Sequence, residues 1–261
     1  MPPLVTPSQT PPARSIGGNP ILLVVTVWLA SAAGLTSAPQ WTGVLTFVFV
    51  MSGWMLAVGV HEFSHALVAH LGGDTTVKGK GYLSMDPRKY ADLQTTVIFP
   101  LIALALGGIG FPGGAVYLRE DLMRSRLWRS ASSLAGPLGT LVVMLALAAA
   151  LKVFPPPVSQ APLTQAVAFL TFLQATALVL NLIPAPGFDG YGVIRPFLPA
   201  GVRSAVGRYE PVAPLLLLAA IFFIPAISDA FFSAAFRLTE VLGLSRLGII
   251  EGLHAFQFWK S

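Results

Sequence analysis

Apolar and polar positions follow one another along the chain in long blocks. The first apolar block, residues 21–35, is shorter than the roughly 20 residues that a helix needs to cross the hydrocarbon of a membrane. Five later blocks are long enough to span the membrane or to enter it: residues 41–71, 93–111, 127–154, 162–183 and 211–236. We therefore expect an all-α, multi-pass membrane protein with about five to six transmembrane helices.

The N-terminal part of the chain allows two interpretations. Residues 1–20 are rich in proline and show no apolar period, which predicts a disordered tail. The block 21–35 could be a membrane helix or the core of a cleaved signal peptide, because the small residues at 30–33 resemble a cleavage region. Under either interpretation, residue 40 lies outside the cell.

The C-terminal part of the chain also allows two interpretations. Pro225 and Asp229 interrupt the block 211–236, which could be one kinked span or two shorter elements. Residues 237–261 are expected to form a membrane-proximal tail, either an amphipathic segment lying on the membrane or a loosely packed end.

Composition supports a membrane protein and narrows its chemistry. Of the residues, 54% are hydrophobic and only 10% are charged, whereas soluble domains carry roughly 25% charged residues. The net charge of +5 is spread over several loops and no base-stacking module is recognisable, so nucleic acid is not an expected partner. The chain has no cysteine, which excludes disulfides and restricts any zinc ligands to His, Asp and Glu.

The distribution of Lys and Arg predicts the topology, because cytoplasmic loops are enriched in these residues. Basic residues gather in segments 78–89, 119–129 and 195–208, whereas segments 36–42 and 155–165 carry no charge. The basic segments are expected on the cytoplasmic side and the uncharged ones outside.

The block 93–111 conflicts with this topology, since basic segments lie on both sides of it. A re-entrant hairpin resolves the conflict: Pro100 and the glycines of 107–114 favour a break in the helix, followed by a strand-like return through residues 115–118. The alternative is an ordinary span whose outer loop happens to be basic.

A short polar motif lies inside the second apolar block. His61, Glu62 and His65 form an H-E-x-x-H pattern, and on a helix the two His lie one turn apart, where both imidazoles can reach one metal ion. An ionisable group inside a membrane costs about 3 kcal/mol or more, which favours a functional role. The alternative is a pair of imidazoles satisfied by neighbouring helices, with Glu62 protonated.

A catalytic zinc usually has three protein ligands and an open position for water. Asp189 is the candidate for the third ligand, because Pro184, Pro186 and the adjacent glycines would end the preceding helix and leave irregular backbone lining a cavity. The alternative is a solvated turn aspartate before Gly190.

These two segments resemble the site-2 protease family of intramembrane zinc metalloproteases. The family pairs an intramembrane H-E-x-x-H helix with a later N-x-x-P-x-x-x-x-D-G segment, here 61–65 and 181–190. The resemblance implies that His61, His65 and Asp189 bind one Zn²⁺. It also implies that Glu62 is the catalytic base and that the active site faces the cytoplasm.

The resemblance extends to further elements of the chain. The hairpin is similar to the element with which the family holds an extended substrate, and it would then lie beside the zinc site. The G-P-x-x-N motif of the family appears as 136–140 with Thr140 in place of Asn, so the resemblance assigns no role to this position. Asn181 is a candidate donor to the tetrahedral oxyanion or to the substrate backbone, or a residue that caps the free carbonyls of the helix end.

The sequence therefore predicts a zinc endopeptidase of the cell membrane that cleaves transmembrane proteins with a water activated by Glu62 on the zinc. The expected organisation is a tail (1–20), a transmembrane metalloprotease domain (21–236, with a catalytic core of about 40–200) and a membrane-proximal tail (237–261). Two alternatives are a membrane metal-binding protein or transporter without hydrolysis, and an inactive scaffold.

Overall fold

The computed structural model describes residues 20–90, 116–155, 157 and 161–260. Within these residues the regular structure consists of α-helices and short 3-10 helices, and no strand occurs. The predicted all-α membrane fold is confirmed. Residues 1–19 and 91–115, which include nearly all of the expected tail and most of the expected hairpin, lie outside the described residues.

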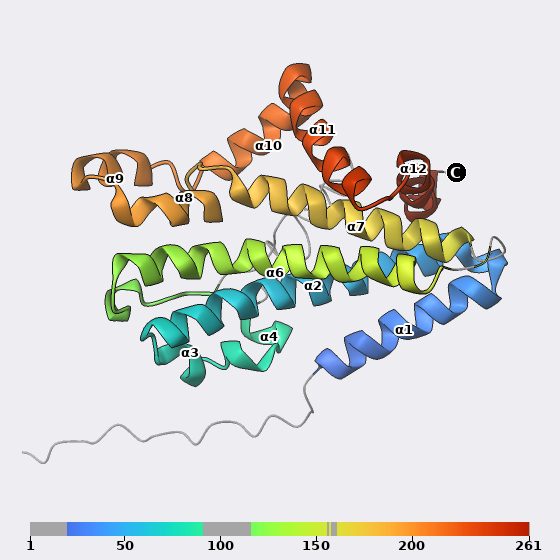
Figure 1. Cartoon of the computed structure of the whole chain (residues 1–261), viewed down its shortest axis with the longest axis horizontal. Helices are drawn as coiled ribbons and strands as arrows, with labels where there is room; N and C mark the ends of the chain where they lie inside the picture. The colour runs from blue at the N-terminus through green and yellow to red at the C-terminus, as the bar shows by residue number, and fades with distance from the viewer. Residues whose placement is uncertain (1–19, 91–115, 156, 158–160, 261) are drawn as a thin grey trace, which may run out of the picture.

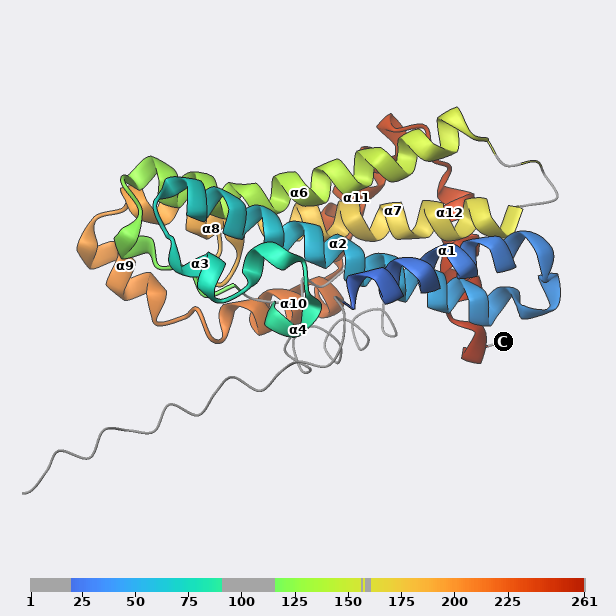
Figure 2. The same cartoon turned by 90° about the horizontal axis from the view of Figure 1, so that it is seen from below.

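Three long helices form the body of the molecule. They are α2 (Thr42–Gly72), α6 (Arg126–Val153) and α7 (Ala161–Leu182), and they lie side by side along the long axis (Figures 1 and 2). Each is long and apolar enough to cross a membrane.

The N-terminal apolar block forms a shorter helix, α1 (Ile21–Ser37), which packs against α2. The ring of Trp28 stacks on Phe49 of α2 with the centroids 5.4 Å apart, and Leu35 is buried. A 3-10 turn, η1 (Pro39–Trp41), links the two helices. Helix α1 is therefore an integral part of the described bundle.

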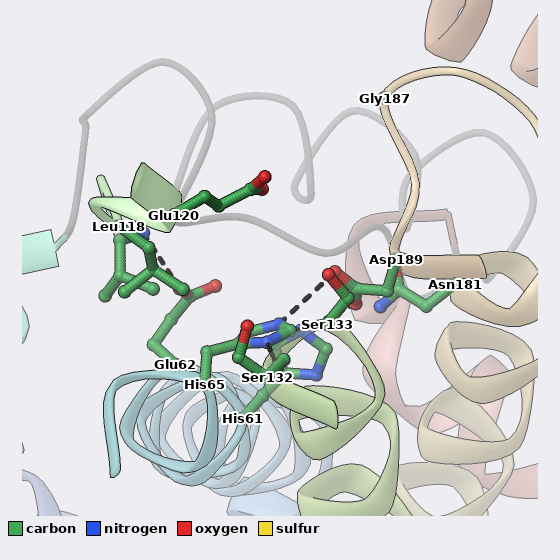
Figure 3. A pocket seen from close by; sticks show the side chains of 11 residues that line it. His61, Glu62, His65, Leu118, Glu120, Ser132, Ser133, Asn181, Gly187 and Asp189 are labelled. Carbon is green, nitrogen blue, oxygen red and sulfur yellow. Dashed lines mark hydrogen bonds and ion pairs between the residues drawn. The ribbon is translucent and has the colours of Figure 1, made fainter. Parts of the chain in front are cut away.

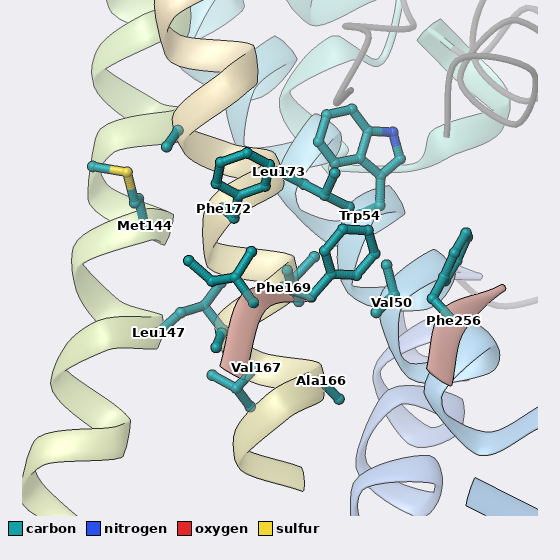
Figure 4. Packing of buried hydrophobic residues seen from close by; sticks show 14 of the residues in the cluster. Val50, Trp54, Met144, Leu147, Ala166, Val167, Phe169, Phe172, Leu173 and Phe256 are labelled. Atoms are coloured by element: carbon teal, nitrogen blue, oxygen red, sulfur yellow. The ribbon is translucent and has the colours of Figure 1, made fainter. Parts of the chain in front are cut away.

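The main core lies around α7, the most buried of the long helices. Phe169, Leu173 and their neighbours on α7 pack between Val50 and Trp54 of α2 and Met144 of α6, as Figure 4 shows. Because α7 is enclosed by other helices, it fixes the spacing of α2 and α6 and holds its own C-terminal end near them.

The interrupted block near the C-terminus forms two elements. Helix α10 (Ala213–Phe223) and helix α11 (Pro225–Val241) meet at an angle of 95°, because Pro225 cannot continue the hydrogen bonding of α10. By length and composition the two together could make a fourth, broken span in addition to the three long helices. With α1, the described part of the chain thus supplies up to five apolar elements for the membrane.

The last helix, α12 (Arg246–Phe256), packs against α7 and α2. This part of the chain is therefore packed more closely against the bundle than the expected membrane-proximal tail. Phe256 is fully buried between Phe47 and Phe169, with ring centroids 5.2 and 5.5 Å away. At Gly252 an added Cβ would lie 2.3 Å from the carbonyl oxygen of Gln165, so only glycine permits this contact.

Short elements gather at one end of the long helices (Figure 1). They are α3 (Thr76–Gly79), η2 (Tyr82–Ser84), α4 (Pro87–Tyr90), η4 (Glu120–Leu122), α8 (Asp189–Ile194), η6 (Arg195–Phe197) and α9 (Ala200–Gly207). Residues 116–119, which enter this region from the expected hairpin, form no regular secondary structure. Buried Asp74 accepts from the backbone N–H of Arg119 at 2.8 Å and thereby ties this segment to the end of α2.

Candidate metal centre

The H-E-x-x-H motif lies on α2 in an uninterrupted apolar helix, as predicted. His61 and His65 project from one face, one turn apart, with their Nε2 atoms 3.0 Å from each other. Glu62 lies beside them, and all three side chains are buried. The helix therefore presents two imidazoles and one carboxylate inside the bundle.

Asp189 reaches the two imidazoles from a different part of the chain (Figure 3). Its Oδ2 lies 3.2 Å from Nε2 of His61, and its Oδ1 lies 3.3 Å from Nε2 of His65. Helix α7 ends at Leu182, the chain turns through Gly187 with φ of 86°, and α8 begins at Asp189. The aspartate thus faces the imidazoles and is not a solvated turn residue.

The spacing of these donors fits a zinc ion. Four ligands at 2.0–2.1 Å in a tetrahedron lie about 3.3 Å from one another. The two Nε2 atoms are 3.0 Å apart, each has one of the two Asp189 oxygens 3.2 or 3.3 Å away, and one donor atom from each residue lies within 4.8 Å of the others. Two imidazole nitrogens and one carboxylate oxygen are a common ligand set for catalytic zinc. His61, His65 and Asp189 form the group of metal-type side chains found in the described part of the chain.

The charge state of Asp189 also suits a metal. Burial alone would raise the pKa of this carboxyl, but the neighbouring imidazoles of His65 and His61 outweigh that effect and hold its pKa below the usual range. A zinc ion in the place of the imidazole protons would favour the carboxylate form for the same electrostatic reason.

Helix α6 holds the second nitrogen of each imidazole. Nδ1 of His65 lies 2.6 Å from the carbonyl oxygen of Ser132, and Nδ1 of His61 lies 2.9 Å from Oγ1 of Thr140. Such contacts fix the orientation of a metal-binding imidazole and leave its Nε2 free for the ion.

Gly136 allows α6 to approach this closely. A Cβ on Gly136 would lie 2.1 Å from Nε2 of His65 and 2.6 Å from Nε2 of His61. Any side chain at position 136 would therefore occupy the space of the metal donors.

The donors open into a cavity of about 250 Å³. One oxygen of Glu62, Oε2, accepts from the backbone N–H of Val116 at 3.1 Å, so the segment 116–119 passes beside the carboxylate. Asn181 lines the same cavity from α7, and its Nδ2 is buried without a hydrogen-bond partner. This amide caps no carbonyl among the described residues and is free to donate to a group in the cavity.

All five candidate residues from the sequence come together here. Sequence reasoning missed Ser132, whose contribution is a backbone carbonyl that no residue type reveals. It also assigned no role to Thr140 and Gly136, although both belong to the 136–140 motif that carried part of the resemblance.

Comparisons with known proteins agree with this site. Relatives bearing the name "Putative zinc metalloprotease Rip2" occur in Mycolicibacterium smegmatis (36% identical over 258 residues, 96% of this chain and 98% of the relative) and in Mycobacterium tuberculosis H37Rv (38% over 260 residues, 97% and 98%). The zinc metalloprotease YwhC of Bacillus subtilis is 28% identical over 165 residues, 61% of this chain and 73% of that protein. No family model and no solved structure matches the chain.

Proposed function

Because the chain belongs to the site-2 family of zinc metalloproteases, we propose that it is an intramembrane endopeptidase that cleaves transmembrane proteins. In this proposal His61, His65 and Asp189 hold the single zinc ion and Glu62 is the catalytic base. The observation that carries it is the buried Glu62 carboxylate beside three converging metal donors, all at a cavity within the apolar bundle.

The chain's own groups suffice to move the proton. A bound zinc ion would acidify the attacking water and polarise the scissile carbonyl. Glu62 takes one proton from that water as its oxygen bonds to the carbonyl carbon, and then gives the proton to the departing amine nitrogen as the C–N bond breaks. The N–H of Val116 engages Oε2 of Glu62, which leaves Oε1 for this transfer.

Asn181 is the proposed donor to the developing oxyanion or to the substrate backbone. Its amide is buried, lines the catalytic cavity and makes no hydrogen bond through Nδ2 in the described structure. A donor that is already desolvated and oriented stabilises the charge of a tetrahedral transition state without reorganisation.

The location of the donors supports a transmembrane substrate. His61 and His65 lie within a helix that is long and apolar enough to span the membrane, so a peptide bond can reach them from a neighbouring membrane segment. The basic segments 78–89, 119–129 and 195–208 favour an active site toward the cytoplasm, in the plasma membrane.

The test is Glu62→Gln, which keeps the size of the side chain and removes the base. We expect the purified variant to bind one zinc per chain, like the wild type, and to leave a reporter membrane peptide uncut. Glu251→Gln is a suitable control, because Glu251 is a half-buried helical glutamate that accepts from Gln165, far from the metal donors in sequence and packing. Undiminished cleavage by Glu62→Gln would exclude the proposed mechanism and favour a metal-binding or transport role.

A further inference from the structure

The two imidazoles are held by partners of different kinds. His65 is oriented by a backbone carbonyl, that of Ser132, whereas His61 is oriented by a side chain, that of Thr140. Both Thr140 and His61 are buried, with 3% and 6% of their surface exposed. Only the support of His61 can therefore be removed by a substitution.

Thr140 differs from several other hydroxyls of the long helices. Thr171, Ser52 and Ser64 each donate to the carbonyl of the residue four positions earlier in their own helix. This local bond is the usual choice for a helical hydroxyl in an apolar setting. The contact of Thr140 Oγ1 with Nδ1 of His61 instead runs from α6 across to α2.

On the side of Thr140, the surroundings offer the His61 ring little other support. Beside Thr140 and His61 lies a cavity of about 10 Å³, also lined by Trp54, Glu62 and Gln174. This space holds at most about one water molecule, so bulk water does not reach the ring from this side.

We propose that Thr140 is a positioning residue that fixes the orientation and tautomer of His61. An imidazole that binds a metal through Nε2 carries its proton on Nδ1, and that N–H then donates to Oγ1 of Thr140. This inference rests on the proposed role of His61 as a zinc ligand.

The test compares Thr140→Val, Thr140→Ser and Thr171→Val in the purified full chain. Valine keeps the shape of threonine without the hydroxyl, serine keeps the hydroxyl, and Thr171 is a buried threonine whose hydroxyl bonds only within its own helix in the described structure. Zinc affinity is measured by competition with a chelator, and kcat and KM with a reporter peptide.

We expect Thr140→Val to lower zinc affinity by roughly 10- to 100-fold and to lower kcat with KM unchanged. Thr140→Ser and Thr171→Val should both have the zinc affinity and the kcat of the wild type. Wild-type zinc affinity in Thr140→Val, or equal losses in the valine and serine variants, would overturn the positioning role. Absence of zinc from the wild type would instead refute the proposed function itself.

A second, independent observation concerns a cavity of about 320 Å³ next to the catalytic one. Its charged lining consists of three arginines and two glutamates, at positions 129, 195, 203, 120 and 210. Arg195 pairs with both carboxylates, directly with Glu120 and at 4.0 Å with Glu210. Glu120 also lines the catalytic cavity, so the Arg195 pair forms part of the wall between the two.

The remaining two arginines give this cavity an excess of positive charge. Arg129 and Arg203 make no ion pair among the described residues, and Nε of Arg129 is buried without a hydrogen-bond partner. An anion in the cavity would balance the charge of the Arg129 and Arg203 guanidinium groups that line it. The unbalanced charge amounts to one, because three arginines face two glutamates.

The position of the cavity indicates which kind of anion it binds. Arg129 lies in the first turn of α6, at the edge of a candidate membrane span. Exposed apolar side chains, those of Phe197, Val202 and Tyr209, occur in the same segment as Arg195, Arg203 and Arg208. Apolar and basic residues mixed in this way are typical of a segment at the lipid headgroups.

The geometry points to a site for the phosphate of an anionic phospholipid, with Arg129 and Arg203 as its donors. The test is native mass spectrometry of protein from micelles that contain equal amounts of phosphatidylglycerol and phosphatidylcholine with the same acyl chains. The wild type should retain phosphatidylglycerol preferentially. Arg129→Gln and Arg203→Gln should each lower that retention several-fold, because each removes one donor.

Arg126→Gln is the matched control, since Arg126 lies on the same helix but outside the cavity. It should retain phosphatidylglycerol like the wild type. Equal retention of the two lipids, or unchanged retention in both cavity variants, would overturn the site. Displacement of the lipid by millimolar inorganic phosphate would assign the cavity to a free anion and refute the lipid. None of these readouts depends on zinc or on proteolysis.

Discussion

The metal centre has two sides that differ in how they are built. On the α2–α6 side, the two imidazoles are buried, their Nδ1 atoms contact α6, and Gly136 leaves no spare space around them. On the α7–α8 side, Asp189 follows a turn, its side chain is 21% exposed, and its ion pairs in the described structure are with the two imidazoles. The first side is shaped by helix packing and the second by the backbone at a helix end.

This difference predicts different responses to substitution. Packed helices cannot absorb added volume, so changes between α2 and α6 should affect metal binding and folding together. The turn before α8 carries its ligand at the edge of the bundle, so changes there should affect metal binding with little loss of folding stability.

The largest effect is expected for Gly136→Ala. The new Cβ would lie within 2.1 Å of a metal donor, which must displace His65 or separate the helices. We expect loss of bound zinc, loss of cleavage and a destabilisation of about 1–3 kcal/mol or more, as for other overpacked cores. Metal analysis and thermal unfolding in detergent check this.

The control for this variant is Gly201→Ala. An added Cβ at Gly201, on α9, meets no atom within 4 Å, so zinc content and melting temperature should stay unchanged. If the Gly136→Ala protein binds zinc fully and unfolds at the normal temperature, the α2–α6 side can absorb added volume. The proposed difference between the two sides of the site would then be wrong.

A smaller and more selective effect is expected for Asp189→Ala. Removal of one of the three proposed ligands should release most of the zinc and abolish cleavage. The side chain of Asp189 is not part of the described core of α2, α6 and α7, so the packing of these helices should be retained. In the metal-free protein this variant loses only the pairing of Asp189 with the two imidazoles, so its melting temperature should fall by less than that of metal-free Gly136→Ala. Metal analysis and unfolding in the presence of a chelator provide the measurement.

Asp229→Ala serves as the matched substitution, because Asp229 is an aspartate of the apolar block 211–236 that lies on α11 and is not among the three candidate donors. Zinc loss from Asp229→Ala with retention in Asp189→Ala would reverse the assignment of the third ligand. Equal loss of stability in metal-free Asp189→Ala would remove the distinction between the two sides.

The smallest effect is expected for Ser130→Ala. The Ser130 hydroxyl of α6 donates to the carbonyl of Val193 in α8 at 2.8 Å and thereby links the two sides. Loss of one such bond should cost about 1 kcal/mol and shift zinc affinity slightly. Ser204→Ala removes a bond to Gly201 within α9 and should leave zinc affinity unchanged, as chelator titration can show.

The sequence carried most of the fold and of the candidate site for identifiable reasons. The apolar blocks 41–71, 127–154 and 162–183 correspond to the long helices α2, α6 and α7, because a bilayer requires about 20 apolar residues per span and that length can be read from the sequence. The H-E-x-x-H spacing placed His61 and His65 together, since residues four apart share a helix face. The choice at Pro225 between one span and two elements needed the structure, because proline can either kink a helix or end it.

By itself the sequence determined the chemical nature of this protein: a membrane chain with a two-histidine zinc motif, a base beside it and a carboxylate after a helix end. Only the tertiary structure decided that Asp189 meets the imidazoles, that Gly136 makes room for them and that Thr140 supports His61. The physical reason is that local spacing fixes which residues share a helix face, whereas contacts between residues 71 or more positions apart depend on how the helices pack. Thr140, which looked like a departure from a family motif, acquires its role only through that packing.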